Sequence, residues 1–251
     1  PVVAWKIHPK LSLAAGPTFN LSQAEFKQGM LSAVDLFRVK GDGFAVGFNA
    51  GLLWQPHAQW SFGVQYRSPT TVDYDGDAYY TPVPGGPTLS SANATAQIRF
   101  PQHIVAGVSF RPNENWNLEF DLDWTDWDYV NGVPINNTPL GNTTLLFNWK
   151  SSFMYEFGVT RLLGKGYFAS AGYFYSENSV PDSTFTPLVP DTGLHLGSVG
   201  FGHRGTRWDW TVAYQFALGD RTVINSDPYG RGNGKYDIFN QALNVAVRLK
   251  F

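Results

Sequence analysis

The sequence predicts an all-β protein, an antiparallel β-barrel that spans a membrane, and three observations lead to this prediction. Apolar and polar residues alternate with a period of two along most of the 251 residues, which is the period of a β-strand. Aromatic residues make up 16% of the chain and charged residues only 15%, below the roughly 25% usual in soluble domains. Short turns also alternate with longer polar loops, as they do in outer-membrane barrels.

The clearest alternation lies in residues 98–130, where two arms are joined by the polar turn 112–115. In the second arm, the apolar residues are Trp116, Leu118, Phe120, Leu122 and Trp124, and the residues between them are Asn117, Glu119, Asp121, Asp123 and Thr125. In the first arm, we expect one face to carry Ile98, Phe100, Ile104, Ala106, Val108 and Phe110, and the other to carry Gln97, Arg99, His103, Ser109 and Arg111.

Eleven arms of this kind follow one another along the chain. We expect them near residues 1–8, 11–26, 43–55, 59–73, 94–111, 115–129, 144–162, 166–179, 193–204, 207–219 and 237–251. Short connections lie at 8–10, 55–58, 112–115, 163–166 and 204–206. Long connections, rich in Gly, Pro, Asn, Asp and Ser, lie at 27–42, 74–93, 130–143, 180–192 and 220–236. This pattern predicts a periplasmic rim of turns and an extracellular rim of loops.

Large apolar side chains are expected to face lipid, and small or charged ones a wet lumen. The expected outward residues are Phe44, Val46, Phe48, Leu52, Trp54, Trp60, Phe62, Val64, Tyr66, Phe153, Tyr155, Phe157, Val159, Trp208, Trp210, Val212, Tyr214 and Phe216. A large soluble β-sandwich or propeller is the alternative, but its core would have to hold this many Trp residues opposite this many ions.

Composition excludes several other classes of protein. The longest apolar runs fall far short of the roughly 20 residues that a spanning helix needs. The chain has no cysteine, so it forms no disulfide and no thiolate metal site. Its net charge of −2 argues against a nucleic-acid partner. No export signal opens the chain, so we expect any such signal to have been removed or to lie upstream.

The last arm ends in alternating apolar residues and Phe251, which resembles the signal that outer-membrane proteins present to the barrel assembly machinery. An ordinary final strand that ends in Phe is the alternative. With Phe251 at the periplasmic rim, eleven arms would begin at the extracellular rim, whereas bacterial single-chain barrels have even strand numbers. We therefore expect strands to be missing before residue 1, or the count to be wrong by one.

The segment 100–130 resembles the outer-membrane long-chain fatty acid transporter family, which includes the toluene and xylene channels. The resemblance rests on Pro101 within a strand, on the approach from Gly107 to the turn, and on the run Trp116, Asp121, Trp124 and Trp127, and it extends loosely over the whole chain. It implies a fourteen-stranded barrel with an N-terminal hatch in its lumen. Residues 1–251 would then be a single barrel domain, the C-terminal portion, without the first strands and the hatch.

The resemblance also implies a function. A hydrophobic molecule, in the first place a long-chain fatty acid, would be taken up passively across the outer membrane of a Gram-negative bacterium by loop capture, lumen binding and hatch-gated release. An aromatic-hydrocarbon channel and a structural or adhesive barrel without cargo are the alternatives. We expect a monomer in contact with outer-membrane lipid, without a cofactor.

Two long loops would form the capture groove that the resemblance implies. Loop 27–42 holds apolar residues at near-helical spacing, namely Met30, Leu31, Ala33, Val34, Leu36 and Phe37, and loop 74–93 holds Tyr79, Tyr80 and Val83. Packing of a short loop helix on top of the barrel would explain Leu31, Val34 and Phe37 equally well.

A fatty acid carboxylate inside the barrel would need a cation where water is scarce. Arg67, Arg99 and Lys150 have the parity of the lumen face and are the candidates. Pairing with Glu119, Asp121 and Asp123 in ladders between strands is the alternative, and we favour it for most of them. An acyl chain could contact the lumen-side residues Leu53, Met154, Phe168 and Phe174.

Nothing in the sequence indicates an enzyme or a metal site. His103 and His195 lie within strands, and Ser109 is six residues from His103, too far along a strand that rises about 3.3 Å per residue. The Gly-x-Ser-x-Gly, His-Glu-x-x-His and P-loop motifs are absent from the sequence. We therefore expect transport and not catalysis.

Overall fold

The computed structural model describes residues 1–29, 31–32, 34–187, 189–226 and 230–250. These residues form fifteen strands of one antiparallel sheet and two short 3-10 helices, η1 (Trp127–Tyr129) and η2 (Asp182–Thr184). Within these residues, no helix is long and apolar enough to cross a membrane. The strands are β1 (Val3–His8), β2 (Leu11–Gln28), β3 (Leu36–His57), β4 (Trp60–Arg67), β5 (Thr70–Thr81), β6 (Leu89–Phe100), β7 (His103–Phe110), β8 (Trp116–Thr125), β9 (Gly132–Thr138), β10 (Gly141–Leu146), β11 (Ser152–Gly164), β12 (Tyr167–Ser176), β13 (Leu194–Arg204), β14 (Trp208–Val223) and β15 (Gly234–Leu249).

The eleven predicted arms are present in this sheet, and the predicted antiparallel β architecture is confirmed. β3 pairs with β4 over one half of its length and with β5 over the other, so β4 and β5 are two halves of one arm. β6 and β7 are likewise one arm, which pairs with β5 and β4. The two arms are interrupted side by side, at residues 68–69 and 101–102, where Pro69 and Pro101 have no N–H to donate.

Several predicted loops are wrong, because strands extend into them. β3 begins at Leu36 inside the expected loop 27–42, and β5 and β6 fill most of the expected loop 74–93. Residues 132–146, expected as a loop and the start of an arm, form the hairpin β9–β10, and β9 pairs with β6. These extensions carry many Gly and Asp residues, which the sequence pattern assigns to loops.

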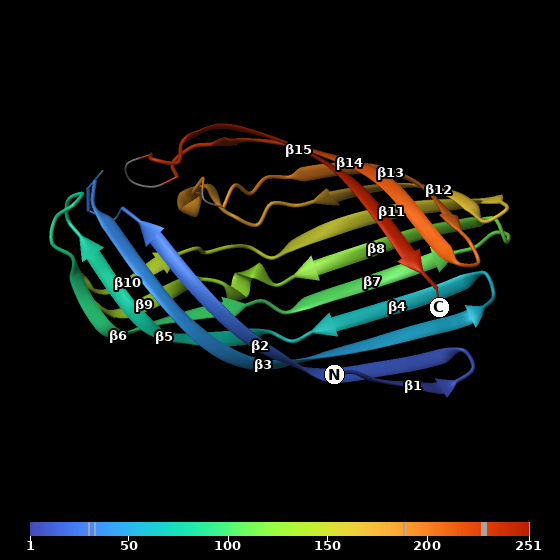
Figure 1. The fold of residues 1–251 in the computed structure, drawn as a ribbon, viewed down its shortest axis with the longest axis horizontal. Coiled ribbons are helices and arrows are strands. Elements are labelled where there is room, and N and C mark those ends of the chain that lie inside the picture. The colour runs from blue at the N-terminus through green and yellow to red at the C-terminus, as the bar shows by residue number, and fades with distance from the viewer. Residues whose placement is uncertain (30, 33, 188, 227–229, 251) are drawn as a thin grey trace.

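The sheet is open between its two ends. Among the described residues, β1 pairs only with β2, and β15 only with β14. Figure 1 shows the curved sheet with its short turns at one end and its long connections, together with β9 and β10, at the other. The predicted separation of turns and loops into two rims therefore holds.

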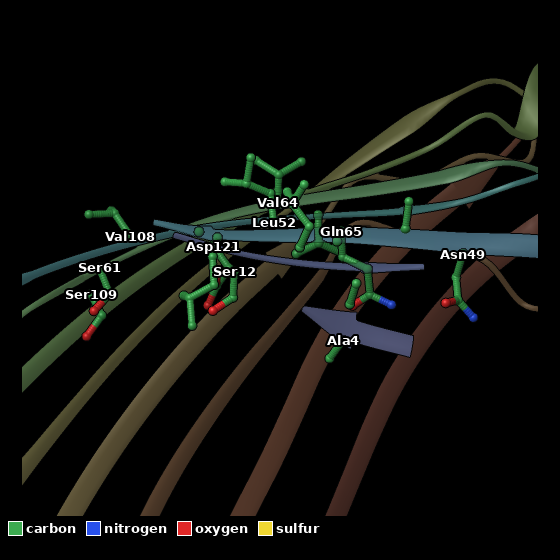
Figure 2. Close-up of a pocket in the computed structure, with 18 of the residues that line it drawn as sticks. Ala4, Ser12, Asn49, Leu52, Ser61, Val64, Gln65, Val108, Ser109 and Asp121 are labelled. Carbon is green, nitrogen blue, oxygen red and sulfur yellow. The ribbon is translucent and has the colours of Figure 1, made fainter. Parts of the chain in front are cut away.

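The two faces of the sheet differ in chemistry below the interruptions, toward the short turns. We call the face of Asp121 and Gln65 the inner face, and the face of Leu52 and Val64 the outer face (Figure 2). Many of the residues expected to face lipid are exposed on the outer face, among them Phe48, Trp54, Val64 and Phe157, at 46% to 52% of their full exposure. This half has the apolar exterior that a bilayer requires.

At the interruptions, one extra residue reverses the parity of the strands. Asn49 of β3 pairs with Arg67, whereas Phe44 pairs with Asp73, so the β4–β5 arm holds one residue more than β3 over this stretch. The β6–β7 arm follows the same shift, since His103 pairs with Arg67 and Arg99 pairs with Thr71. Such an extra residue is the defining feature of a β-bulge.

Beyond the interruptions, toward the long connections, the inner face is apolar and the outer face is charged. Phe37, Val39, Ala78, Tyr80, Ala94, Val133 and Ile135 form a buried cluster on the inner face. The alternate residues of β5, namely Asp73, Asp75 and Asp77, are exposed on the outer face. Ile98 was expected to face lipid beside Ile104, but it packs against buried residues of the inner face. The extra residue places Ile98 and Ile104 on opposite faces of the sheet.

Candidate ligand cavities

The apolar inner face beyond the interruptions encloses a cavity of about 960 Å³, which we call the outer cavity. β2, β3, β5, β6, β9 and β10 form its wall, and residues of the connections after β12 and β14 form the remaining side. Its volume is at the upper end of the roughly 300–1,000 Å³ range of small-molecule pockets. Its apolar lining includes Phe26, Val39, Ile98, Val133, Ile135 and Phe147.

Polar groups near the outer cavity are mostly engaged by partners. The hydroxyls of Tyr74 and Ser22 lie 2.7 Å apart. Lys27 Nζ lies 3.2 Å from Glu25 Oε1, and Arg38 donates to the same oxygen. Lys27 and Glu25 flank Phe26, which packs against the inner cluster, so these charged groups alternate onto the outer face, and the cavity is suited chiefly to an apolar molecule.

Residues 177–187 and 189–193, between β12 and β13, fold over the inner face, and we call these described residues the β12–β13 segment. Val180 and Phe185 of the segment are buried in a cluster with Val223 of β14. Val189 lines both the outer cavity and a second cavity of about 360 Å³, which we call the inner cavity. The segment therefore lies between the two cavities.

The inner cavity is lined by aromatic and apolar side chains together with several polar ones. The rings of Trp127 and Trp149 meet edge to face, with their centroids 5.2 Å apart. Met154 of β11 and Val180 belong to the apolar part of the lining, and Asp123 of β8 belongs to the polar part. Aromatic faces of this kind favour contact with a flat ring or an alkyl chain.

Arg221 of β14 holds the β12–β13 segment against the inner face. Its side chain is only 10% exposed, and its guanidinium donates to Asp182 Oδ1 at 2.6 Å, to the carbonyl of Val180 at 2.7 Å and to the carbonyl of Asp191 at 2.9 Å. It also lies over the ring of Phe185, 4.9 Å from the centroid. The hydrogen bond from Arg221 lowers the pKa of the Asp182 carboxyl below its ordinary value, so this carboxyl is ionised near neutral pH.

A third cavity, of about 550 Å³, lies on the polar inner face below the interruptions (Figure 2). Gly51, Gly63 and Gly107 of three neighbouring arms line it, together with the carboxylates of Glu119 and Asp121. Asp121 pairs with Gly107 on one side and with Glu156 of β11 on the other. This part of the lumen is therefore wide and acidic.

Of the three predicted carboxylate-binding cations, Arg67 alone has the expected place. It ends β4 on the inner face and is exposed, and its guanidinium forms no hydrogen bond or ion pair with any residue that the structure describes. Arg99 lies on the outer face with its guanidinium 5.6 Å from the Tyr129 ring, because the extra residue reverses its parity. Lys150 is exposed in the connection 147–151 and not in a strand.

Neither Arg67 nor Lys150 pairs with the lumen carboxylates in the described part of the chain. Asp123 instead lies 2.6 Å from His103 Nε2. The expected ladders of basic and acidic residues are thus not formed by these cations.

The predicted capture residues divide into exposed and buried ones. Leu31, Val34, Leu36 and Val83 are between 44% and 72% exposed near the extracellular rim. Phe37 and Tyr80 belong to the buried cluster of the inner face, so their assignment to an exposed loop is wrong. Tyr79 is half-buried on the outer face, 5.6 Å below the guanidinium of Arg38. Met30 and Ala33 lie outside the described residues.

The four predicted pocket residues all have the parity of the inner face, but they do not converge on one cavity. Leu53 lines the cavity of Figure 2, and Met154 lines the inner cavity. Phe174 pairs with Glu156, and Phe168 lies six residues from it along β12, a separation of about 20 Å at the usual rise of a strand.

Sequence reasoning missed Arg221, Trp149 and the outer cavity. Arg221 was expected in the loop 220–236, but the alternation of β14 continues to Val223, and this continuation was the available signal. The outer cavity depends on the reversal of parity at 68–69 and 101–102, and the Pro residues there mark its position but not its effect.

The comparisons with known proteins agree on one family. The model of the family described as outer membrane protein transport protein (OMPP1/FadL/TodX) matches residues 1–251. A long-chain fatty acid transport protein of Escherichia coli K12 is 20% identical over 234 residues, covering 87% of this chain and 52% of that protein. The corresponding protein of Salmonella typhi is 21% identical over 235 residues, covering 86% of this chain and 53% of that protein. The chain thus spans about half the length of these curated relatives.

Solved structures share the fold. A Pseudomonas aeruginosa FadL homologue has a TM-score of 0.74 at 17% identity and covers 98% of this chain and 64% of its own. The Pseudomonas putida toluene transporter TodX has a TM-score of 0.70 at 15% identity, with 97% and 66% covered. The CymD monoaromatic hydrocarbon channel has a TM-score of 0.66 at 18% identity, with 100% and 72% covered.

Proposed function

The chain belongs to this family of outer-membrane transport proteins, and from that membership we propose that the protein takes up long-chain fatty acids across the outer membrane of a Gram-negative bacterium. The observation that carries the proposal is the outer cavity, an apolar space of about 960 Å³ on the inner face of a wall whose exterior is charged at the same level. Since a charged exterior faces water, an apolar interior there serves a hydrophobic molecule and not the lipid bilayer.

The proposed path has four steps and needs no energy source, because the cargo moves toward lower concentration. Exposed Leu31, Val34, Leu36 and Val83 collect the molecule at the rim. The molecule then enters the outer cavity and passes to the inner cavity and the lumen, where Arg67 meets its carboxylate. Release would follow a movement of the N-terminal hatch that family membership implies.

An aromatic hydrocarbon is the second candidate cargo. The edge-to-face pair of Trp127 and Trp149 and the stacking of Phe147 on Trp149, with centroids 4.8 Å apart, favour a small flat ring. A neutral cargo would give Arg67 no part in binding, and this difference separates the two candidates.

The lipid bilayer and the assembly machinery are the other proposed partners. The exposed apolar outer face below the interruptions suits acyl chains, and a single closed barrel suits a monomer. Phe251, the proposed contact of the barrel assembly machinery, lies outside the described residues.

The test is uptake of labelled oleate and labelled toluene by cells that carry the full-length protein, with Arg67→Ala beside the wild type. Arg99→Ala is the matched control, since Arg99 lies on the outer face. Because Arg67 is exposed and its charge is screened, we expect about a threefold to tenfold loss of oleate uptake from Arg67→Ala, with toluene entry unchanged.

The other outcomes decide between the alternatives. Entry of toluene but not oleate into wild-type cells would indicate the hydrocarbon channel. Entry of neither would contradict transport altogether and favour a structural or adhesive barrel.

A further inference from the structure

We propose that the β12–β13 segment is a gate between the outer and inner cavities, and that Arg221 is the latch that keeps it closed. The cargo that passes rests on the proposed function, whereas the gate itself rests on the contacts of the segment. Val189 lines both cavities, so a displacement of the segment would join them.

Several contacts tie the segment to the wall, and both of its ends are held: Glu177 accepts the hydroxyl of Tyr155 at 3.2 Å, and Thr192 Oγ1 donates to the carbonyl of Asp220 at 2.8 Å. Arg221 binds Asp182, Val180 and Asp191 from β14. Thr184 Oγ1 donates to the carbonyl of Phe147, and Ser179 Oγ lies 2.7 Å from Ser152 Oγ of β11. Of these contacts, Arg221 makes the most and reaches three separate acceptors of the segment.

The segment is built to move as one unit. Its two ends are joined to each other, because the Asp191 carboxylate accepts the N–H of Ser179 at 2.6 Å and of Val180 at 2.7 Å. Its base is fixed to the wall by two backbone hydrogen bonds, from the N–H of Glu177 to the carbonyl of Phe153 at 2.9 Å and from the N–H of Lys150 to the carbonyl of Ser179 at 2.8 Å. Beyond Ser179 the described residues of the segment contain no strand, and their contacts with Arg221, Phe147 and Ile224 each involve a side chain. Breaking these side-chain contacts would therefore release the part of the segment beyond Ser179, with its base as the hinge, without separating any strands.

The segment presents apolar side chains to both cavities, as the passage of a hydrophobic molecule requires. Phe185 faces the outer cavity, and Val180 lines the inner cavity beside Trp149. Behind them lie Met154 and Asp123, which belong to the lumen wall. An open segment would make a continuous route from the apolar outer cavity to the polar lumen.

The gate can be tested by thiol labelling, because residues 1–251 contain no cysteine. Met154→Cys places a thiol behind the gate, and Leu146→Cys places one in the outer cavity, where Leu146 is 63% exposed. The full-length protein, with any cysteine elsewhere replaced by Ser, is labelled in intact cells by a maleimide that cannot cross the membrane. Each reporter is combined with Arg221→Met, which removes the latch but keeps an apolar side chain over Phe185.

We expect Arg221→Met to raise the labelling rate of the Met154→Cys thiol at least about fivefold, the factor that the loss of one net hydrogen bond implies, and to leave the Leu146→Cys rate unchanged. Arg204→Met is the matched control, because Arg204 also lies over a ring, that of Phe168 at 5.0 Å, but at the turn end of β13. Asp182→Asn, a milder change at a partly exposed site, should give a smaller rise. Equal rates with and without the latch would overturn the proposal.

A cross-link provides the opposite perturbation. The hydroxyls of Ser152 and Ser179 are buried and 2.7 Å apart, so Ser152→Cys with Ser179→Cys should form a disulfide that keeps the segment closed. Ala213→Cys with Asn244→Cys, within the paired strands β14 and β15, is the control cross-link. Oxidation should lower ligand uptake only in the first pair, and a reductant should restore it; equal uptake when oxidised and reduced would contradict the gate.

The labelling result separates this proposal from the proposed function. Faster labelling of Met154→Cys without uptake of oleate or toluene would support the gate and contradict the cargo. Uptake of oleate with no effect of Arg221→Met on labelling would support the cargo and contradict the gate.

Discussion

The glycine opposite Asp121 decides where that carboxylate lies. A Cβ atom on Gly107 would come within 1.9 Å of Asp121 Oδ1, whereas one on Gly63, the cross-strand partner of Gly107, would meet its nearest atom only at 3.9 Å. The lumen carboxylate therefore occupies the space that Gly107 leaves free.

We predict that Gly107→Ala displaces the Asp121 side chain and destabilises the barrel by about 1 kcal/mol, the low end of the effect of overpacking, because the atom that must move is the end of a side chain and not backbone. Gly63→Ala is the matched control and should change stability by less than about 0.5 kcal/mol. Urea unfolding of the full-length protein in detergent, followed by Trp fluorescence, measures both variants. Equal stability of the two variants would contradict a steric role for Gly107.

Single residues could be assigned to a face from the sequence only within uninterrupted strands. Leu53, Met154 and Phe174 lie in such strands, and their inner parity follows from the alternation alone. Arg99 lies beyond the extra residue of its arm, and Lys150 lies after β10 has ended, so the alternation no longer applies to either. Convergence on one cavity depends on pairings between distant strands, which one sequence does not provide.

The interrupted arms are the elements that organise the site. Ser68 fastens one interruption to β3, since its N–H donates to the carbonyl of Phe48 and its Oγ accepts the N–H of Phe48, both at 2.9 Å. Gln102 and Asp126 connect the next two arms at the same level, with Gln102 Nε2 2.8 Å from Asp126 Oδ2. Side-chain hydrogen bonds thus replace part of the ladder where the strands are broken.

The reversal of faces can be tested with two neighbouring residues of β6. We predict that Ile98→Glu, on the apolar inner face, abolishes uptake and lowers the yield of folded protein, because it buries a charge without a partner. Arg99→Glu, on the exposed outer face, should leave folding within about 0.5 kcal/mol of the wild type. The heat-dependent shift of the folded band in gel electrophoresis reports folding. If Arg99→Glu lowered the yield of folded protein more than Ile98→Glu did, the reversal of faces would be contradicted, and the unbroken alternation that the sequence predicts would be correct.

The loops were predicted less well than the arms for a physical reason. A strand that leaves the bilayer faces water on its outside, so it carries Asp and Gly residues that also occur in loops, as residues 74–81 of β5 do. The turns at the other end, in contrast, connect strands directly at the membrane boundary, and their positions agree with the expected ones.

At the scale of the whole molecule, composition and periodicity were sufficient for the fold. Sixteen per cent aromatic residues and end-to-end alternation predict a membrane barrel because few other folds place large apolar side chains on the outside. The place of the β9–β10 hairpin in the sheet could not be predicted, because it depends on the pairing of Thr95 and Ala96 in β6 with Asn136 and Ile135 in β9. Nothing in the local pattern of either segment encodes that partner.

The open sheet leads to the last prediction. All six residues of β1 are exposed, and among the described residues no strand pairs with β15 on the side away from β14. Unpaired backbone groups in lipid cost several kcal/mol each, so these edges need further strands in a membrane. We predict that a polypeptide limited to residues 1–251 does not give a heat-resistant folded band in detergent or lipid, whereas the full-length protein does.

A folded band from residues 1–251 alone would require β1 and β15 to find other partners. Cross-linking distinguishes the two ways in which this can happen. A disulfide from Trp5→Cys to Val245→Cys within one chain would show that the sheet closes on itself, and the same link between two chains would show that the edges pair with those of a second copy. Absence of the band, together with a folded full-length protein, would show that the free edges are completed by strands of the rest of the protein, and the outer and inner cavities would then lie inside a closed wall.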